Sequence, residues 1–238
     1  MLMPSTVLIL STEQELALML KIKQFVLLAG LFFSGFSAQA VDWELAKDAE
    51  GVKVFTGAVA GSEYKAFRGE IVVDAELNQL MAVLDDTANF SNWMYNCKSP
   101  KLLYKASLLD RYQYLQNDFP WPAKDREMIL RNEISQDPAS RVTTVKLSSV
   151  ALEKLPAPAR QAMPKTGAAV RMEAVQGFFE LSPVSDTQTK VIFQLHLDPG
   201  GGLPAGLVNA LIVDNPFETL KALAKQAVRP EYANFNPF

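Results

Sequence analysis

The chain has 238 residues, of which 49% are hydrophobic, and its formal net charge is −3 at pH 7. It contains no run of basic residues, which argues against a nucleic-acid partner. A single cysteine excludes an intrachain disulfide, and a single histidine excludes a metal site built on several histidines.

The N-terminal residues 1–40 have the pattern of a secretory signal. Basic residues precede an apolar run over residues 25–36, which ends in an Ala-x-Ala cleavage site at Ala40. The run is shorter than the roughly 20 residues that span a bilayer, so a membrane anchor is the weaker interpretation. We expect cleavage near Ala40, with Met19 a candidate for the true start, and export to the periplasm or the medium.

The remaining residues, 41–238, contain no repeat or linker, which predicts a single domain. Asp42 can cap a helix and Gly51 can stop one, so a short helix is expected over residues 43–50. Two strands around a glycine-containing turn follow, over residues 51–56 and 64–73.

Helical spacing appears next. Asp74 is expected to cap a helix whose apolar residues recur at helical intervals, and a second short helix should follow residues 85–89. The apolar positions of the two helices are Leu77, Leu80, Met81, Leu84, Phe90, Trp93 and Met94.

From residue 101 the pattern becomes that of strands joined by short turns. The expected strands are residues 101–106, 108–118, 127–136, 141–150, 170–181 and 189–198. Such an antiparallel meander with flanking helices belongs to the α+β class. One connection, residues 151–169, is long and carries three prolines. It is either a solvated loop or a gate that touches a membrane or a partner.

The chain ends in a strand, a glycine-rich turn over residues 199–204 and an amphipathic segment over residues 205–226. A helix in this position buries its apolar stripe on the sheet, and a sheet that curves around it can enclose a ligand. Pro216 should kink this helix and give a lid a place to hinge. The side chains expected to face the enclosed space are Leu207, Leu211, Ile212 and Asn215.

The hairpin over residues 108–136 supplies the expected wall of that space. Met128, Leu130 and Asn132 share one face of its second strand. With a loop symmetric about its middle, Gln113 lies opposite Asn132, and an amide pair in an apolar wall can orient the polar end of a ligand. Alternatively, the two amides bond only to each other or to the backbone.

Motifs for catalysis are weak. His196 lies on the strand face opposite an apolar set and is expected near the surface, and Cys97 is expected to be a small buried residue. The glycines of residues 200–202 imitate a dinucleotide fingerprint, but no further strand follows them. We therefore expect no catalytic residue, no metal and no cofactor.

Three motifs occur in an order that resembles START domains, the steroidogenic-acute-regulatory-protein-related lipid-transfer domains. They are Phe119-Pro-Trp-Pro-Ala-Lys-Asp-Arg-Glu, then Val170-Arg171, and then Asp198-Pro-Gly-Gly-Gly-Leu-Pro. Gly51-Val-Lys-Val-Phe and Lys65-Ala-Phe-Arg-Gly also fit, so the resemblance covers nearly all of residues 41–238.

The resemblance implies a helix-grip fold, in which a curved antiparallel sheet wraps around a long C-terminal helix and encloses a lipid or sterol. It makes residues 151–169 a flexible loop beside the cavity mouth. Arg126 with Glu127 matches the family's Arg-Asp pair, which adds Arg126 to the candidate ligand-binding residues. Gln113 and Asn132 replace the charged pair of sterol-carrying members with amides that can bond a hydroxyl, carbonyl or ester.

Three functions compete at this point. The first is a non-enzymatic binder or carrier of a lipid or other hydrophobic molecule, with transient membrane contact through residues 151–169. The second is a cyclase-like or hydrolase-like enzyme on the same scaffold, for which His196, Arg126 and Glu127 are the visible candidates. The third is a partner-binding protein that uses residues 151–169 and the proline-rich hairpin as its docking surface.

Overall fold

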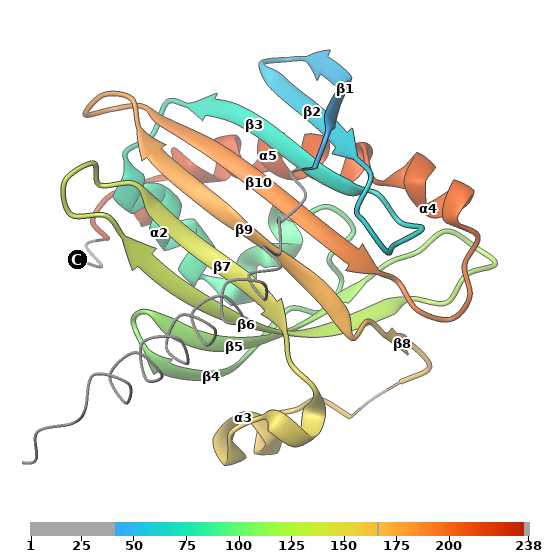
Figure 1. Cartoon of the computed structure of the whole chain (residues 1–238). Helices are drawn as coiled ribbons and strands as arrows, with labels where there is room; N and C mark the ends of the chain where they lie inside the picture. Colours follow the sequence, from blue (N-terminus) through green and yellow to red (C-terminus); the bar gives the residue numbers. More distant parts are fainter. Residues whose placement is uncertain (1–40, 166, 236–238) are drawn as a thin grey trace, which may run out of the picture. The chain divides into compact units, whose positions relative to one another are not determined.

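A computed structural model describes residues 41–165 and 167–235, so the predicted signal lies outside the described residues. A ten-stranded sheet dominates the fold (Figure 1). Its strands are β1 (Trp43–Ala49), β2 (Val52–Gly57), β3 (Ala66–Val73), β4 (Lys101–Ser107), β5 (Asp110–Asn117), β6 (Arg126–Gln136), β7 (Thr143–Ser149), β8 (Val170–Arg171), β9 (Ala174–Pro183) and β10 (Thr189–Asp198). The helices are α2 (Leu77–Asp85), η1 (Thr87–Asn92), η2 (Leu152–Lys154), α3 (Ala157–Gln161), α4 (Ala205–Leu211), α5 (Asp214–Ala227) and η3 (Pro230–Tyr232).

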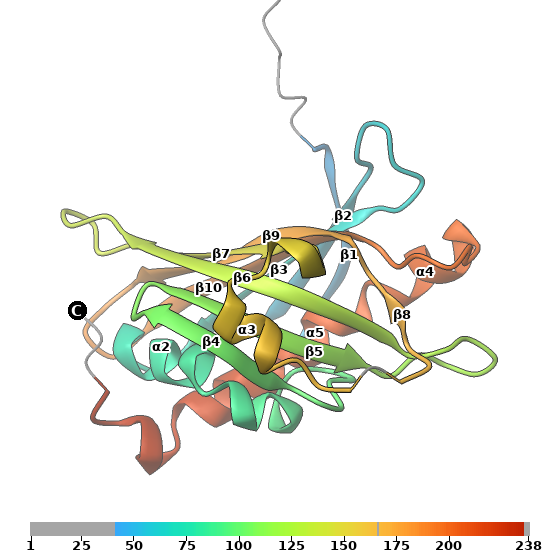
Figure 2. The same ribbon diagram turned by 90° about the horizontal axis from the view of Figure 1, so that it is seen from below.

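The strands follow the order β1-β2-β3-β10-β9-β7-β6-β5-β4, and each neighbouring pair is antiparallel. Only β8 departs from this pattern, because it pairs with β6 in parallel. Helices α2 and α5 cover one face of the curved sheet (Figures 1 and 2). This arrangement confirms the predicted α+β class and the helix-grip fold.

The core lies between the sheet and α5. Phe193 of β10 stacks on Phe179 of β9 with ring centroids 4.2 Å apart, and Leu220 and Leu223 of α5 are fully buried over the same face. Gly69 of β3 permits this close approach. A Cβ atom added there would lie 2.7 Å from Leu220 Cδ1. The absence of a side chain at Gly69 therefore sets how closely α5 can pack on the sheet.

We predict that Gly69→Ala lowers the free energy of unfolding by about 1–3 kcal/mol, because the new methyl group overpacks the helix–sheet contact. Urea unfolding followed by circular dichroism measures the change. Gly206→Ala is the matched control, since a Cβ atom there meets nothing within 4 Å. Equal stability of the Gly69→Ala variant and the natural chain would contradict this description of the contact.

The C-terminal amphipathic segment forms two helices instead of the single predicted one. Ile212 and Val213 separate α4 from α5, although both keep helix-like backbone angles. Pro216 explains the position of the break, because it has no N–H to donate to the carbonyl of residue 212 and its ring crowds that carbonyl. The predicted effect of Pro216 is thus confirmed, and it separates α4 as a short unit of its own.

The helix predicted over residues 43–50 is wrong, because this segment forms the edge strand β1. Glu50 and Gly51 have φ values of 50° and 78°, and they form the two-residue turn of a hairpin that pairs Ala49 with Val52. Such turns match the twist of the strands they join. The glycine interpreted as a helix stop is therefore a hairpin residue.

Other element boundaries also differ from the prediction, and the second short helix, η1, overlaps the expected break at residues 85–89. Glu76 caps α2 in place of Asp74, and its backbone N–H donates to Gln79 Oε1 at 2.9 Å. The strand predicted over residues 170–181 is divided into β8 and β9. Ser149 stabilises the interruption, since its Oγ accepts from the Val175 N–H at 3.1 Å.

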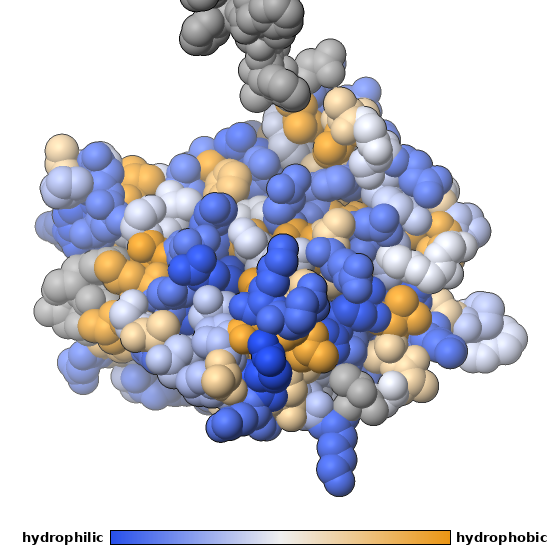
Figure 3. Space-filling model, turned by 60° about the horizontal axis from the view of Figure 1, so that its bottom comes forward, coloured by the Kyte–Doolittle hydropathy of each residue, from blue (hydrophilic) through white to orange (hydrophobic). Residues whose placement is uncertain are grey.

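The η2–α3 part of the long connection packs on the face of the sheet opposite to α5. Leu155 and Ala159 are buried there against Leu103, Tyr114 and Ile129. The η2–α3 part of the segment therefore lies away from the expected place beside the cavity mouth, because its apolar side chains pack on the outer face of β4 to β6. On the side that carries α3, apolar residues occur in scattered small groups among hydrophilic ones (Figure 3).

Candidate functional site

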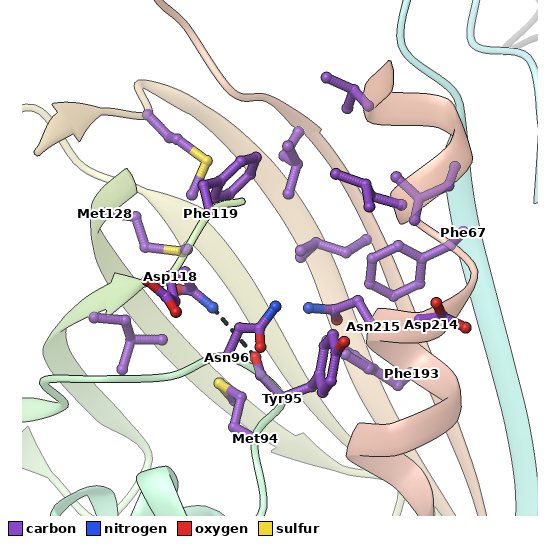
Figure 4. Close-up of a pocket in the computed structure, with 18 of the residues that line it drawn as sticks. Phe67, Met94, Tyr95, Asn96, Asp118, Phe119, Met128, Phe193, Asp214 and Asn215 are labelled. Carbon is purple, nitrogen blue, oxygen red and sulfur yellow. Dashed lines mark hydrogen bonds between the residues drawn. The ribbon is translucent and has the colours of Figure 1, made fainter. Parts of the chain in front are cut away.

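A cavity of about 370 Å³ lies between the inner face of the sheet and the helical layer, at α4 and the first turn of α5 (Figure 4). Its buried floor is apolar because inward-facing residues of several strands meet there. They include Phe67, Leu115, Met128, Leu130, Leu147 and Phe193. This volume and lining are typical of sites for small apolar molecules.

Polar groups gather at the mouth of the cavity, in the segment Met94 to Asn96 and at the start of the β5–β6 loop. In Figure 4 the Asn215 side chain points from α5 toward Asn96, whereas Asp214 points away. The Asp214 carboxylate lies 3.4 Å from Lys47 Nζ, and Asp118 lies 3.0 Å from Lys98 Nζ. Both mouth carboxylates are thus already paired with lysines.

Five of the predicted site residues line this cavity. Met128 and Leu130 lie on its floor, and Ile212 covers it from the α4–α5 junction. Leu211 and Asn215 lie near the mouth. The alternation of β6 and the position of the C-terminal segment were therefore sufficient to locate both sides of the cavity.

Gln113 and Asn132 do not line it. The predicted register is wrong by two residues, because Gln113 pairs with Leu130 and Asn132 pairs with Arg111. The two amides are still close enough for Asn132 Nδ2 to donate to Gln113 Oε1. Gln113 Nε2 in turn donates to Thr87 Oγ1 at 2.5 Å. The structure therefore favours the alternative in which these amides bond to each other, although Asn132 Oδ1 itself has no hydrogen-bond partner.

Arg126 is buried outside the cavity and binds backbone carbonyls. Its Nε, Nη1 and Nη2 donate to the carbonyl oxygens of Pro199, Lys124 and Gly200 at 3.1, 2.6 and 3.0 Å. It thereby fixes the glycine-rich turn that leads into α4, in which Gly200, Gly201 and Gly202 all have positive φ.

Leu207, the remaining predicted site residue, also lies outside the cavity. Its side chain is 44% exposed on α4, whereas Val208 on the same helix is buried over the cavity. The expectation placed Leu207 on the same line of the amphipathic segment as Leu211. Leu207 instead lies on the outer side of α4.

Asn117 is a lining residue that the sequence analysis missed. Strand β5 alternates, so Arg111, Gln113, Leu115 and Asn117 share its inner face. Asn117 is only 9% exposed and its Oδ1 has no hydrogen-bond partner. Its Nδ2 donates to the Tyr95 carbonyl at 3.4 Å (dashed line in Figure 4). The alternation that identified Gln113 also pointed to this residue.

A buried ion pair supports the same strand. Arg111 Nη1 lies 2.5 Å from Asp85 Oδ1 at the end of α2, and Nη2 donates to the Leu84 carbonyl at 2.8 Å. Burial lowers the pKa of the Arg111 guanidinium, and the Asp85 carboxylate opposes this shift. The pair does not line the cavity, so it stabilises the contact of α2 with β5.

The titratable residues considered for catalysis do not line the cavity. Glu127 is buried on the outer face of β6, where it accepts from Tyr114 Oη at 2.7 Å and from Arg171 Nε at 2.8 Å. His196 Nε2 lies 3.1 Å from Ser62 Oγ. Burial raises the pKa of the Cys97 thiol to about 12, as expected for a small buried residue.

Within the described ranges, no group of three or more His, Cys, Asp or Glu side chains is arranged to hold a metal ion. No helix in the described part of the chain is both long and apolar enough to cross a membrane.

A sheet that grips a C-terminal helix around an apolar cavity defines a helix-grip protein with a small-molecule site. The sequence matches the START domain family over residues 28–228, and the chain belongs to this family. An uncharacterized protein of Pseudomonas aeruginosa is 32% identical over 206 residues, which cover 87% of this chain and 96% of that protein.

Solved structures of similar proteins agree with this family assignment. The crystal structure of a STAR-related lipid transfer protein fragment from Xanthomonas axonopodis is 34% identical, with a TM-score of 0.69, and covers 79% of this chain and 99% of that chain. Human STARD10 shares the fold at 19% identity, with a TM-score of 0.67 and coverage of 79% and 74% of the two chains.

Proposed function

We propose that this protein binds a lipid or another hydrophobic small molecule in the cavity beneath α4 and carries it without chemical change. The apolar floor is the observation that carries this proposal. Burial of ligand surface there would contribute about 25 cal/mol per Å² of apolar area. Membership of the START family and similarity to a bacterial STAR-related lipid transfer protein support the same function.

The positions of the titratable residues favour a binder over the cyclase-like or hydrolase-like alternative. Catalysis requires a group that reaches the bound molecule. His196, Arg126 and Glu127 all lie outside the lining of the cavity. The carboxylates at the mouth, Asp118 and Asp214, are exposed and paired with lysines. This arrangement supports binding as the function.

Leu130→Trp tests the proposal, because an indole on the cavity floor takes the space of the ligand. Native mass spectrometry of the protein from its own host should show a retained or exchangeable apolar ligand. The variant should lose at least about tenfold in affinity, since ligand burial supplies most of the binding free energy.

The matched control is Val72→Trp, which places the same side chain on the outer face of β3, where Val72 is already exposed. It should bind as the natural protein does. A natural protein that neither retains nor exchanges any apolar ligand would contradict the proposed function.

We propose that the ligand is loaded through transient contact with a membrane, and we assign this contact to the cavity mouth rather than to residues 151–169. Trp121 is 92% exposed in the β5–β6 loop, directly after Phe119 and Pro120 of the lining. Leu207 and the 36%-exposed Leu211 lie on α4 at the same end of the sheet (Figures 1 and 2). Exposed tryptophan and leucine side chains partition into a bilayer interface.

Trp121→Ala should slow ligand exchange with lipid vesicles several-fold and leave the affinity for a soluble ligand analogue unchanged. Vesicle-to-vesicle transfer measured by fluorescence dequenching tests this. Leu152→Ala, in the long connection on the outer face, is the control and should transfer at the natural rate. The assignment fails if the effects of the two substitutions are reversed.

Export through residues 1–40 remains our proposal for localisation, based on the basic, apolar and Ala-x-Ala pattern. N-terminal sequencing of the protein isolated from the host's periplasm or medium should give Val41 as the first residue. Recovery of the uncleaved chain from the cytoplasm would contradict it.

A further inference from the structure

The polarity of the cavity changes in one direction, from an apolar floor to a polar mouth. Among the buried residues that line it in the described part of the chain, Asn117 is the only polar one. The other polar lining residues, Tyr95, Asn96, Asp118, Asp214 and Asn215, are partly or fully exposed. A bound molecule would therefore meet Asn117 where its apolar part ends and its polar part begins.

Asn117 is held in place and has an unused acceptor. A β-bridge joins its backbone to Cys97, and the neighbouring Asp118 N–H donates to the Asn96 carbonyl at 2.8 Å. Its Nδ2 already donates to the Tyr95 carbonyl, which leaves the buried Oδ1 without a partner. In the described ranges Asn132 Oδ1 is a second buried acceptor without a partner, but of the two residues only Asn117 lines the cavity. Buried acceptors are normally paired, so a ligand in the cavity can supply the donor that Asn117 Oδ1 lacks.

The charges around the cavity disfavour an anion. No lysine, arginine or histidine is among the lining residues in the described ranges. The nearest mouth lysines are already neutralised, because Lys98 pairs with both Asp118 and Asp125 and Lys47 pairs with Asp214. The hydrogen bonds that Lys98 donates to both carboxylates raise its pKa, so it stays charged and paired with them. An anionic headgroup at Asn117 would be buried without a counterion.

We propose that the ligand is an uncharged amphiphile that enters tail first and donates a hydroxyl or amide hydrogen to Asn117 Oδ1. This inference rests on the proposed function and gives it a chemical class. Its polar end lies beneath Asn96 and Asn215 at the mouth, and its tail contacts Leu115, Leu130 and Phe193. A volume of about 370 Å³ is near the lower limit for ligand pockets and suits one chain or a compact ring system.

A series of probes that share one alkyl chain tests the inference. Displacement of N-phenyl-1-naphthylamine from the protein gives affinities for 1-dodecanol, methyl dodecanoate and dodecanoate at pH 8. Dodecanol should bind about three- to tenfold more tightly than the ester, since only the alcohol donates a hydrogen bond. Dodecanoate should bind at least about tenfold more weakly than dodecanol, because its charge has no partner in the cavity.

Two variants locate the effect. Asn117→Leu should reduce the affinity for dodecanol to that for the ester and leave ester binding nearly unchanged. Asn132→Leu makes the same replacement at a buried amide outside the cavity, and its preference for the alcohol should equal that of the natural protein. Thermal unfolding of each variant shows whether it is folded, and the natural protein's ligand series does not depend on either variant.

The outcomes separate the two proposals. If dodecanoate binds as well as dodecanol, or if Asn117→Leu keeps the preference for the alcohol, the inference about Asn117 is overturned while the proposed function stands. If no member of the series displaces the probe, the proposed function fails as well.

Discussion

The close contact of α5 with the sheet at Gly69 is the constraint on which the rest of the structure depends. Leu220 and Pro216 lie over this glycine, so α5 has no space beneath it at this point. Pro216 also interrupts the helix, which leaves α4 as a separate unit with a single fully buried side chain, Val208. The cavity exists because the helical layer is tightly packed at one end and only loosely packed at the other.

Polar contacts outside the cavity position its mouth. Arg126 binds the carbonyls of Pro199 and Gly200 in the turn before α4. Asn209 holds α4 to the β2–β3 connection, where its Oδ1 accepts from the Lys65 N–H at 2.9 Å. Both contacts lie outside the cavity, and among its described lining residues Asn117 is the only buried polar one. The polar contacts that position the mouth are thus separate from the apolar floor that binds the ligand. A carrier needs this separation, because movement of the mouth during ligand entry must not disturb the floor.

The sequence was sufficient for features that depend on local periodicity. Alternation placed Met128 and Leu130 inside, and Pro216 marked the break in the last helix. It was insufficient where a small change in turn geometry decides the outcome. A one-residue error in the centre of the β5–β6 loop shifts the predicted register by two residues, so Asn132 was expected opposite Gln113 where the structure has Leu130. The Glu50-Gly51 turn fits a helix end as well as a hairpin, and only pairing with β2 determines which one forms.

Diffraction from crystals of the purified protein under xenon pressure tests the central claim most directly, because xenon occupies apolar cavities that water leaves empty. Xenon should bind between Leu130, Leu147 and Phe193 beneath α4. If no xenon binds there and these side chains contact α4 directly, the interior is solid and the protein has no internal site for a hydrophobic ligand.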